Sequence, residues 1–347
     1  MSAYSVGIDL HPYRSSVEIL DCNGHVFKRC QVKGPLPELT AWLAAEVPGE
    51  MAVCFEASCG YGYAYEQLSR VAQRVKVAHP GHLRLIYRSK RKNDRVDASK
   101  LAKLMYLDAV PAVHVPSSQV RLWRQTIEFR QKLLTGQVAT KNQLRALLRE
   151  RGIRPPRGLW TRKGLAWLAG VELDEQGSAL QRDLLLEQLR QTRDKILRVE
   201  KQLKAISDGH PAGVMLLRTI PGIGPRTAEA LAAYIDDVRR FDRLKQVGAY
   251  FGWAPCQDAS GAANRLGHIT RDGPSTVRKL MCEAAWTAVR TNTTVRRYFQ
   301  RVMRDDPDRK KIAIVATAHR MIRVMGAMMR AGTAYDPAYD PAAFRGQ

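Results

Sequence analysis

The sequence predicts an α/β domain, a long helical region and then a second, mostly helical domain. Three observations support this class. Short β-rich runs alternate with helical patterns in the first part of the chain, apolar residues recur at helical spacing from Ser118, and glycine and proline punctuate the sequence after Pro211. The chain has 347 residues, of which 45% are hydrophobic, ample for buried cores.

The first domain begins with three predicted strands, at residues 4–10, 15–21 and 25–32. Asn23-Gly24 is typical of a type I′ hairpin turn, so these strands form an antiparallel meander. The following elements are a helix after Pro35, a strand at 51–55, a helix at 63–73, a strand at 75–78 and a further helix. This order is that of the ribonuclease H-like fold, a mixed sheet covered by helices.

The middle region predicts a basic helical surface. Only Glu128 and Glu150 oppose the cations of its first long segment, which are Arg121, Arg124, Arg130, Lys132, Lys141, Arg145, Arg149 and Arg151. A merely solvated helix usually mixes both signs. We therefore expect this surface to follow a phosphate backbone, with Arg121, Arg124, Lys141 and Arg145 as contacts.

A heptad seam follows in the same region. Its positions alternate by four and three and are Leu185, Leu189, Thr192, Ile196, Val199, Leu203 and Ile206. An intramolecular helical hairpin and a dimeric coiled coil both explain so short a seam. Pro211 ends the helix. The predicted domains are residues 1–112, 113–210 and 211–331, with a flexible tail at 332–347 in which Ala-Tyr-Asp-Pro occurs twice.

The charge of the chain is strongly positive. Lys and Arg number 56 against 33 Asp and Glu, a net charge of +23. Nucleic acid is the polyanion that best explains this excess, and an anionic membrane surface is the weaker explanation. The most apolar late stretch, residues 312–329, is interrupted by His319, Arg320 and Arg323, so we expect no membrane span. The N-terminus lacks a secretory pattern and no cysteines have C-x-x-C spacing, which favours a cytoplasmic protein.

Four acidic residues form the first candidate site. Asp9 ends the first predicted strand and Glu56 ends the fourth, so parallel neighbouring strands bring both carboxylates to one sheet edge. Asp94 and Asp97 share a helix face within an otherwise basic segment. Four carboxylates at one edge repel each other unless divalent cations neutralise them, and oxygen ligands suit Mg²⁺ or Mn²⁺. Taken singly, such acids are commonly helix caps or solvated residues.

The C-terminal domain carries two further motifs. Residues 219–228 are close to a helix-hairpin-helix signature, in which Gly222 and Gly224 let backbone N–H groups approach a phosphate and Arg226 adds charge. A Gly/Pro turn between packed helices also explains this motif. Farther on, Ser260-Gly261 lies in a predicted loop with Arg265, His268 and Arg271 close in sequence, the cations that a serine attacking phosphate requires. Ser-Gly in a loop is more often a turn.

These motifs, in this order, resemble the DEDD transposases of bacterial insertion sequences, the family of bridge-RNA-guided serine recombinases. The resemblance rests on Gly7-Ile8-Asp9, Phe55-Glu56, residues 94–98, Pro221-Gly222-Ile223-Gly224-Pro225, Ser260-Gly261 and Gly267-His268-Ile269-Thr270, and spans nearly the whole chain. It implies a RuvC-like domain in which Asp9, Glu56, Asp94 and Asp97 bind Mg²⁺ for catalysis. It also implies that Ser260 attacks DNA and becomes covalently joined to it. Many relatives carry a second serine where this chain has Ala259.

The resemblance further implies a structured noncoding guide RNA, donor and target DNA, a homo-oligomer (dimer or tetramer) and a nucleoid-associated location in the bacterial cytoplasm. Two alternatives stay open. One is a metal-dependent, RuvC-like junction-resolving nuclease that uses water, with Ser260 only a loop residue. The other is a non-enzymatic nucleic-acid-binding protein, which leaves the four acids unexplained.

Overall fold

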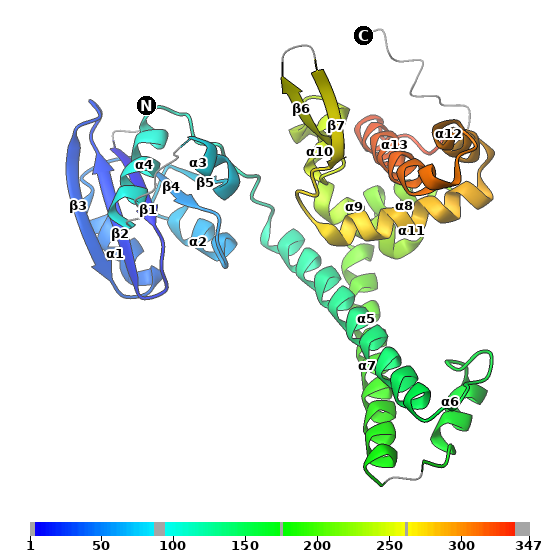
Figure 1. The fold of residues 1–347 in the computed structure, drawn as a ribbon. Coiled ribbons are helices and arrows are strands. Elements are labelled where there is room, and N and C mark those ends of the chain that lie inside the picture. The colour runs from blue at the N-terminus through cyan, green and yellow to red at the C-terminus, as the bar shows by residue number, and fades with distance from the viewer. Residues whose placement is uncertain (1–3, 87–93, 174–175, 261–262, 337–347) are drawn as a thin grey trace. The chain divides into compact units, whose positions relative to one another are not determined.

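The computed structural model describes residues 4–86, 94–173, 176–260 and 263–336. The chain divides into two compact units, residues 1–121 and 122–347 (Figure 1). The predicted separation of the helical middle from the C-terminal domain stays a prediction, and the tail from residue 337 lies outside the described residues.

The N-terminal unit is built on a five-stranded mixed sheet, as the sequence predicts. Its strands are β1 (Tyr4–Asp9), β2 (Arg14–Leu20), β3 (Val26–Lys33), β4 (Met51–Glu56) and β5 (Arg74–Ala78). Their order across the sheet is β3-β2-β1-β4-β5. β1 is antiparallel to β2 and parallel to β4, and β4 is parallel to β5. β1 and β4 therefore lie at the centre, with neighbours on both sides.

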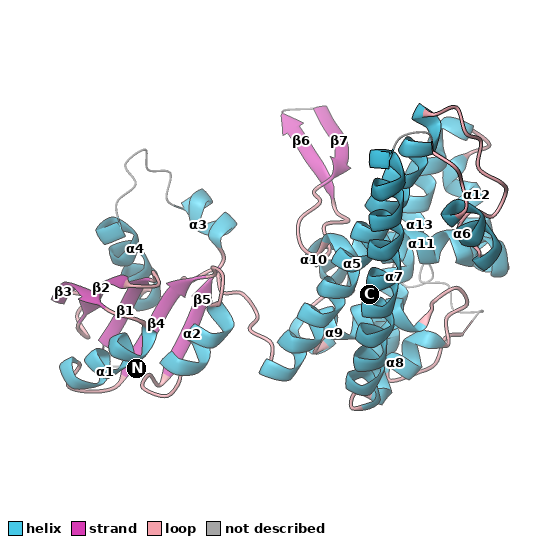
Figure 2. Ribbon diagram, turned by 90° about the horizontal axis from the view of Figure 1, so that it is seen from below, coloured by secondary structure: helices cyan, strands magenta, loops and turns pink. Residues whose placement is uncertain are grey.

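Helices cover both faces of this sheet (Figure 2). They are α1 (Leu36–Glu46), α2 (Tyr61–Leu68), α3 (Pro80–Ile86) and α4 (Asp94–Tyr106). Leu39 of α1 and Leu68 of α2 share a core with Ile8, whereas Leu101 of α4 packs with Cys54. Residues that alternate along one strand thus face different cores, which explains the nearly continuous apolar runs of the central strands.

Two local predictions in this unit are wrong. Gly24 is left-handed (φ +80°) and donates to the carbonyl of Asp21, but Asn23 does not have the positive φ that a type I′ turn requires. The helix predicted at 63–73 ends at Leu68. There the N–H groups of Arg70 and Val71 turn back to carbonyls three residues earlier and close a tight turn.

The helix α5 (Ser118–Glu150) starts in the first unit and leads into the second, which continues with α6 (Arg162–Ala169) and α7 (Gln176–Asp208). α5 and α7 lie side by side in both views (Figures 1 and 2). Leu185 and Leu189 of the heptad seam share a buried cluster with Leu144 of α5, and Leu203 packs with Trp123. Of the two explanations left open for the seam, the structure supports the intramolecular hairpin.

The rest of this unit packs around one large core. Its helices are α8 (Pro211–Arg218), α9 (Pro225–Ile235), α10 (Leu244–Tyr250), α11 (Ser275–Thr291), α12 (Thr293–Met303) and α13 (Lys310–Ala331), with 3-10 turns at Val238–Arg240 and Pro307–Arg309. Residues 255–269 form a hairpin of β6 (Pro255–Ser260) and β7 (Ala263–Ile269), which the sequence did not predict, and Ser260 was expected in a loop. Ser260 therefore ends a strand.

Among the residues that the structure describes, Pro307–Ala331 is long and apolar enough to cross a membrane by those two criteria. Within it, 56% of the apolar stretch is buried inside the protein. Ile322 and Met325 of α13 are fully buried in the same core as Leu217 and Met281. The apolar character of α13 is thus explained by its place in a protein core.

Candidate active site

The register of two central strands brings the first two acids together. Ile8 of β1 pairs with Phe55 of β4 in parallel, so Asp9 and Glu56 are the next residues on adjacent strands and end at the same edge. Ile8 and Phe55 are fully buried, which fixes this register. The Asp9 side chain is 24% exposed, and Glu56 is exposed.

A glycine brings the helix with the other two acids to the same strand. A Cβ on Gly7 would lie 2.1 Å from the carbonyl oxygen of Ala98 and 2.2 Å from the nitrogen of Ala102, so the α4 backbone rests directly on β1. Asp97 immediately precedes Ala98. Asp94 begins α4, and its side chain lies outside the described residues.

Basic side chains already contact two of these carboxylates. His11 Nε2 lies 3.4 Å from Asp9 Oδ2, and Lys100 Nζ lies 2.9 Å from Asp97 Oδ1. Within the described part of the chain, no three His, Cys, Asp or Glu side chains are close enough together to hold a metal ion. The donor chemistry fits a hard divalent cation, because partly exposed carboxylates on two strand ends and a helix supply only oxygen atoms.

Sequence reasoning missed Glu18, a buried acid beside this edge. Glu18 lies opposite Gly7 on β2 and is 1% exposed. It accepts a hydrogen bond of 2.9 Å from Ser99 Oγ of α4 and another from Arg29 Nε of β3. The Glu18 carboxylate raises the pKa of Arg29. A lone acid inside an apolar strand was the signal available in the sequence, and it marks a residue that fastens α4 to the sheet.

The predicted nucleophile lies at the end of the β6–β7 hairpin. Ser260 pairs with Ala263 at the last rung of the ladder. Its side chain and that of Arg265 lie outside the described residues, as do Gly261 and Ala262 entirely. His268 of β7 and Arg271 beyond it are exposed. The structure thus gathers these predicted residues on one hairpin and the chain that leaves it.

The helix-hairpin-helix prediction is modified by the position of its glycines. Gly222 is left-handed (φ +91°), and a Cβ there would lie 2.7 Å from the nitrogen of Ala288, so it packs against α11. Gly224 meets no atom within 4 Å and precedes α9. Of the two glycines, therefore, only Gly224 offers an open approach to a phosphate.

Arg226 of this motif is engaged by a buried acid. Its Nη1 lies 2.9 Å from Glu229 Oε2, and the Glu229 side chain is 3% exposed. Burial raises the pKa of Glu229 to about 7, against the opposing effect of Arg226. The positive charge of Arg226 thus lies against the acid Glu229 of the same helix.

Two of the four predicted contacts on α5 already have acceptors within the protein. Arg124 donates from Nε to the carbonyl of Ala233 at 2.8 Å and from Nη2 to that of Tyr234 at 3.2 Å. Arg121 pairs with Glu66 and donates to the carbonyl of Pro116 at 2.6 Å. Both guanidiniums are thus held by protein acceptors, and their contact with phosphate stays a prediction.

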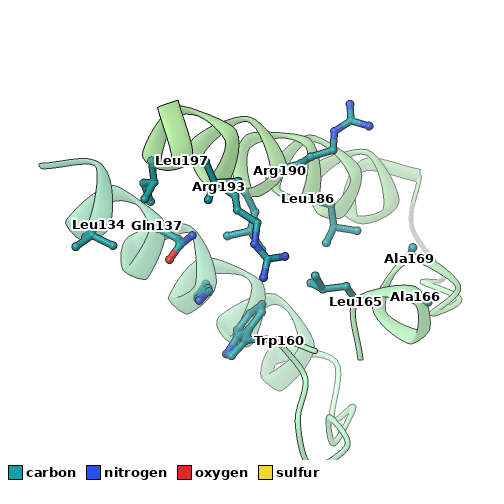
Figure 3. A pocket seen from close by; sticks show the side chains of 13 residues that line it. Leu134, Gln137, Trp160, Leu165, Ala166, Ala169, Leu186, Arg190, Arg193 and Leu197 are labelled. Atoms are coloured by element: carbon teal, nitrogen blue, oxygen red, sulfur yellow. The ribbon is translucent and has the colours of Figure 1, made fainter. Parts of the chain in front are cut away.

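The other two predicted contacts flank an aromatic ring. Lys141 Nζ lies 5.4 Å and the Arg145 guanidinium carbon 5.2 Å from the centre of Trp160. Lys141 and Trp160 also line a groove of about 590 Å³ between α5, α6 and α7 (Figure 3). Lys141 thus faces an open, partly apolar groove, and Arg145 is exposed beside Trp160.

Comparisons with known proteins agree with this architecture. The model described as "Transposase" of the DEDD, IS110 type matches residues 6–152, and the model "Transposase IS116/IS110/IS902 family" matches residues 214–300. A "Probable family 20 transposase" of Pseudomonas aeruginosa is 28% identical over 97% of this chain and 100% of its own length. The "Transposase for insertion sequence element IS1328" of Yersinia enterocolitica is 28% identical over 81% of this chain and 82% of its own.

A third relative, the "Transposase for insertion sequence element IS1111A" of Coxiella burnetii, is 26% identical over 69% of this chain and 66% of its own length. Fold, carboxylate edge and relatives define a DNA transposase, an enzyme that recombines DNA. Both models describe transposases of the IS110/IS116 type, and together they match most of this chain, which is thus similar to the DEDD transposases of that family.

Proposed function

We propose that this transposase is an RNA-guided recombinase that cuts and rejoins DNA strands through a covalent phosphoserine at Ser260. In this proposal the N-terminal unit is a RuvC-like, ribonuclease H-like domain, and Asp9, Glu56, Asp94 and Asp97 hold Mg²⁺ or Mn²⁺. The strand order β3-β2-β1-β4-β5 supports the fold assignment. The observation that carries the site is the parallel register that ends Asp9 and Glu56 at one edge.

The metal, when bound, neutralises the carboxylates and the charge that develops on the phosphate. The chain itself supplies the nucleophile. As Ser260 Oγ forms a bond to phosphorus, the bond from phosphorus to the leaving DNA oxygen breaks, and the serine proton passes in net terms to that oxygen. Attack by another DNA hydroxyl on the phosphoserine reverses these changes. The phosphate ester energy is thus kept for rejoining.

Cations and open backbone positions supply the nucleic-acid contacts in this proposal. The net charge of +23 supports binding of RNA and two DNA duplexes together. We assign contacts to Lys141, Arg145, Gly224, Arg265 and Arg271, of which Lys141 and Arg145 lie beside Trp160. Sequence choice then belongs to base pairing with the guide RNA, in an oligomer of this chain.

The test is to incubate the purified protein with its element-end DNA, the flanking noncoding RNA and Mg²⁺, followed by denaturing electrophoresis. We expect a DNA–protein adduct that disappears in Ser260→Ala and in Asp9→Asn and requires the RNA. Ser275→Ala, at an exposed serine of the same unit, is the matched control and retains the adduct. Cleavage without an adduct, unaffected by Ser260→Ala, indicates the water-using nuclease and overturns the proposal.

A further inference from the structure

The hairpin that carries Ser260 has little support beyond its base. Figure 2 shows β6 and β7 projecting away from the helices of their unit. Pro255, Cys256 and Gln257 on β6 are exposed, as are Gly267 and His268 on β7. Since these described side chains bury no core, the direction of the hairpin depends on how its two ends are fixed.

The two ends cross in close backbone contact. Gly252, before β6, and Gly273, after β7, are both left-handed (φ +69°). A Cβ on Gly252 would lie 2.2 Å from the carbonyl oxygen of Asp272, and one on Gly273 would lie 2.1 Å from that of Tyr250. The N–H of Arg271 donates to the carbonyl of Gly252 at 3.2 Å. Only residues without a Cβ allow the crossing this close.

One side chain of α11 ties this crossing to the core. Arg278 Nη1 donates to the carbonyls of Phe251 at 3.1 Å, Asp272 at 2.5 Å and Gly273 at 3.1 Å. Phe251 belongs to the entering chain and the other two to the leaving chain. A single guanidinium thus joins both ends of the hairpin to α11, whose Val277 and Met281 are fully buried.

A small change of angle at the base of the hairpin moves Ser260 at its far end by a larger distance, so the Arg278 contact is important for the position of Ser260. Five residue steps separate Pro255 from Ser260, a span of about 17 Å at roughly 3.3 Å per residue. A tilt of about 5° at the base moves the end by about 1.5 Å. Displacement of a reacting group by about 1 Å can cost on the order of a hundredfold in rate.

We infer that Arg278 is a positioning residue, which fixes the angle of the β6–β7 hairpin so that Ser260 is presented to the DNA phosphate. The inference rests on the proposed function, because it takes Ser260 as the nucleophile. Arg278 acts through backbone carbonyls, and lysine does not place a donor at the same point, because its amine is one bond nearer the backbone than Nη1.

A spin label on the hairpin tests the mechanical part without any substrate. Cys256 is exposed on β6, and the other exposed cysteines are Cys22 and Cys59. In a Cys22→Ser, Cys59→Ser background, a nitroxide on Cys256 reports hairpin motion in its resonance line width. We expect Arg278→Lys to narrow the lines with an unchanged melting temperature. Lys279→Ala, which removes the exposed cation of the next residue, leaves the spectrum unchanged.

The catalytic part is tested by the rate of adduct formation on element-end DNA with guide RNA. We expect Arg278→Lys to lower this rate about 10- to 100-fold, with DNA affinity unchanged and Lys279→Ala at the wild-type rate. Unchanged line widths, or a mobile hairpin with a wild-type rate, overturn the inference. Ser260→Ala in parallel separates the two failures, because an adduct that survives this change overturns the proposed function itself.

Discussion

The carboxylate edge of the N-terminal unit and the serine hairpin of the C-terminal unit are held in opposite ways. β1 and β4 have strand neighbours on both sides and helices on both faces, and Ile8 and Phe55 are fully buried. The hairpin is a two-stranded sheet whose described residues are exposed, apart from the half-buried Ile269 at its base. The positions of the acids are thus set by an entire core, whereas the position of Ser260 depends on a few contacts at the hairpin base.

The largest expected effect comes from changing an acid while its strand stays intact. Asp9→Asn removes the charge but preserves the shape of the side chain, so strand cleavage should fall by about a thousandfold or more with an unchanged free energy of unfolding. Gel-based cleavage kinetics and urea unfolding measure the two quantities. Glu50→Gln, at an exposed acid before β4, is the matched control. Equal activity of both variants would remove Asp9 from the site.

A second prediction disturbs the packing of α4 on β1 and leaves the four acids unchanged. Gly7→Val places atoms about 2 Å from the backbone of Ala98 and Ala102, which must move α4 away from β1. We expect a loss of about 4 kcal/mol in the free energy of unfolding, localised by hydrogen–deuterium exchange to β1 and β4. Gly136→Ala, at a glycine of α5 with no atom within 4 Å, should instead stabilise by about 1 kcal/mol. Unchanged protection of β1 would contradict the close approach.

The sequence predicted the central strands well because their residues are buried on both faces of the sheet. Apolar runs marked β1 and β4, and their order placed Asp9 and Glu56 at one edge once parallel pairing was assumed. The β6–β7 hairpin was missed for the opposite reason. The described residues Pro255, Cys256 and Gln257 are exposed, and Pro255–Ser260 shows no apolar alternation.

Charge was the property that sequence interpreted least well. Arg124 was predicted to contact phosphate. The carbonyls of Ala233 and Tyr234 that accept its hydrogen bonds lie far away along the chain, so the sequence did not reveal them. Glu18 was overlooked because a strand position reveals neither Ser99 nor Arg29 beside it. Such partners are created only when the chain folds.

A third prediction tests the hydrogen bonds that join Arg124 of α5 to α9 in the C-terminal unit. Arg124→Ala removes two hydrogen bonds to α9 carbonyls, and we expect it to lower the free energy of unfolding by about 3 kcal/mol. The salt dependence of DNA binding should stay unchanged, whereas loss of a phosphate contact lowers its slope by roughly 0.9. Lys132→Ala, at an exposed cation of the same helix, should change stability by less than about 0.5 kcal/mol. A reduced salt slope in Arg124→Ala would support the phosphate contact that the sequence predicts for Arg124.

The smallest expected effect is a dependence of the unfolding free energy on pH, caused by Glu229 of α9. Burial raises the pKa of Glu229 from 4.5 to about 7, so the folded state binds this proton more tightly than the unfolded state. The contribution therefore favours folding below pH 4.5 and is lost as pH rises towards 7. Between pH 5 and pH 8 we expect wild type to lose about 2 kcal/mol of unfolding free energy relative to Glu229→Gln, whose amide does not titrate. Urea unfolding of both proteins at each pH measures this difference. The difference in unfolding free energy could instead be independent of pH, or favour wild type at pH 8. Either result would show that the Arg226 ion pair outweighs the effect of burial on Glu229.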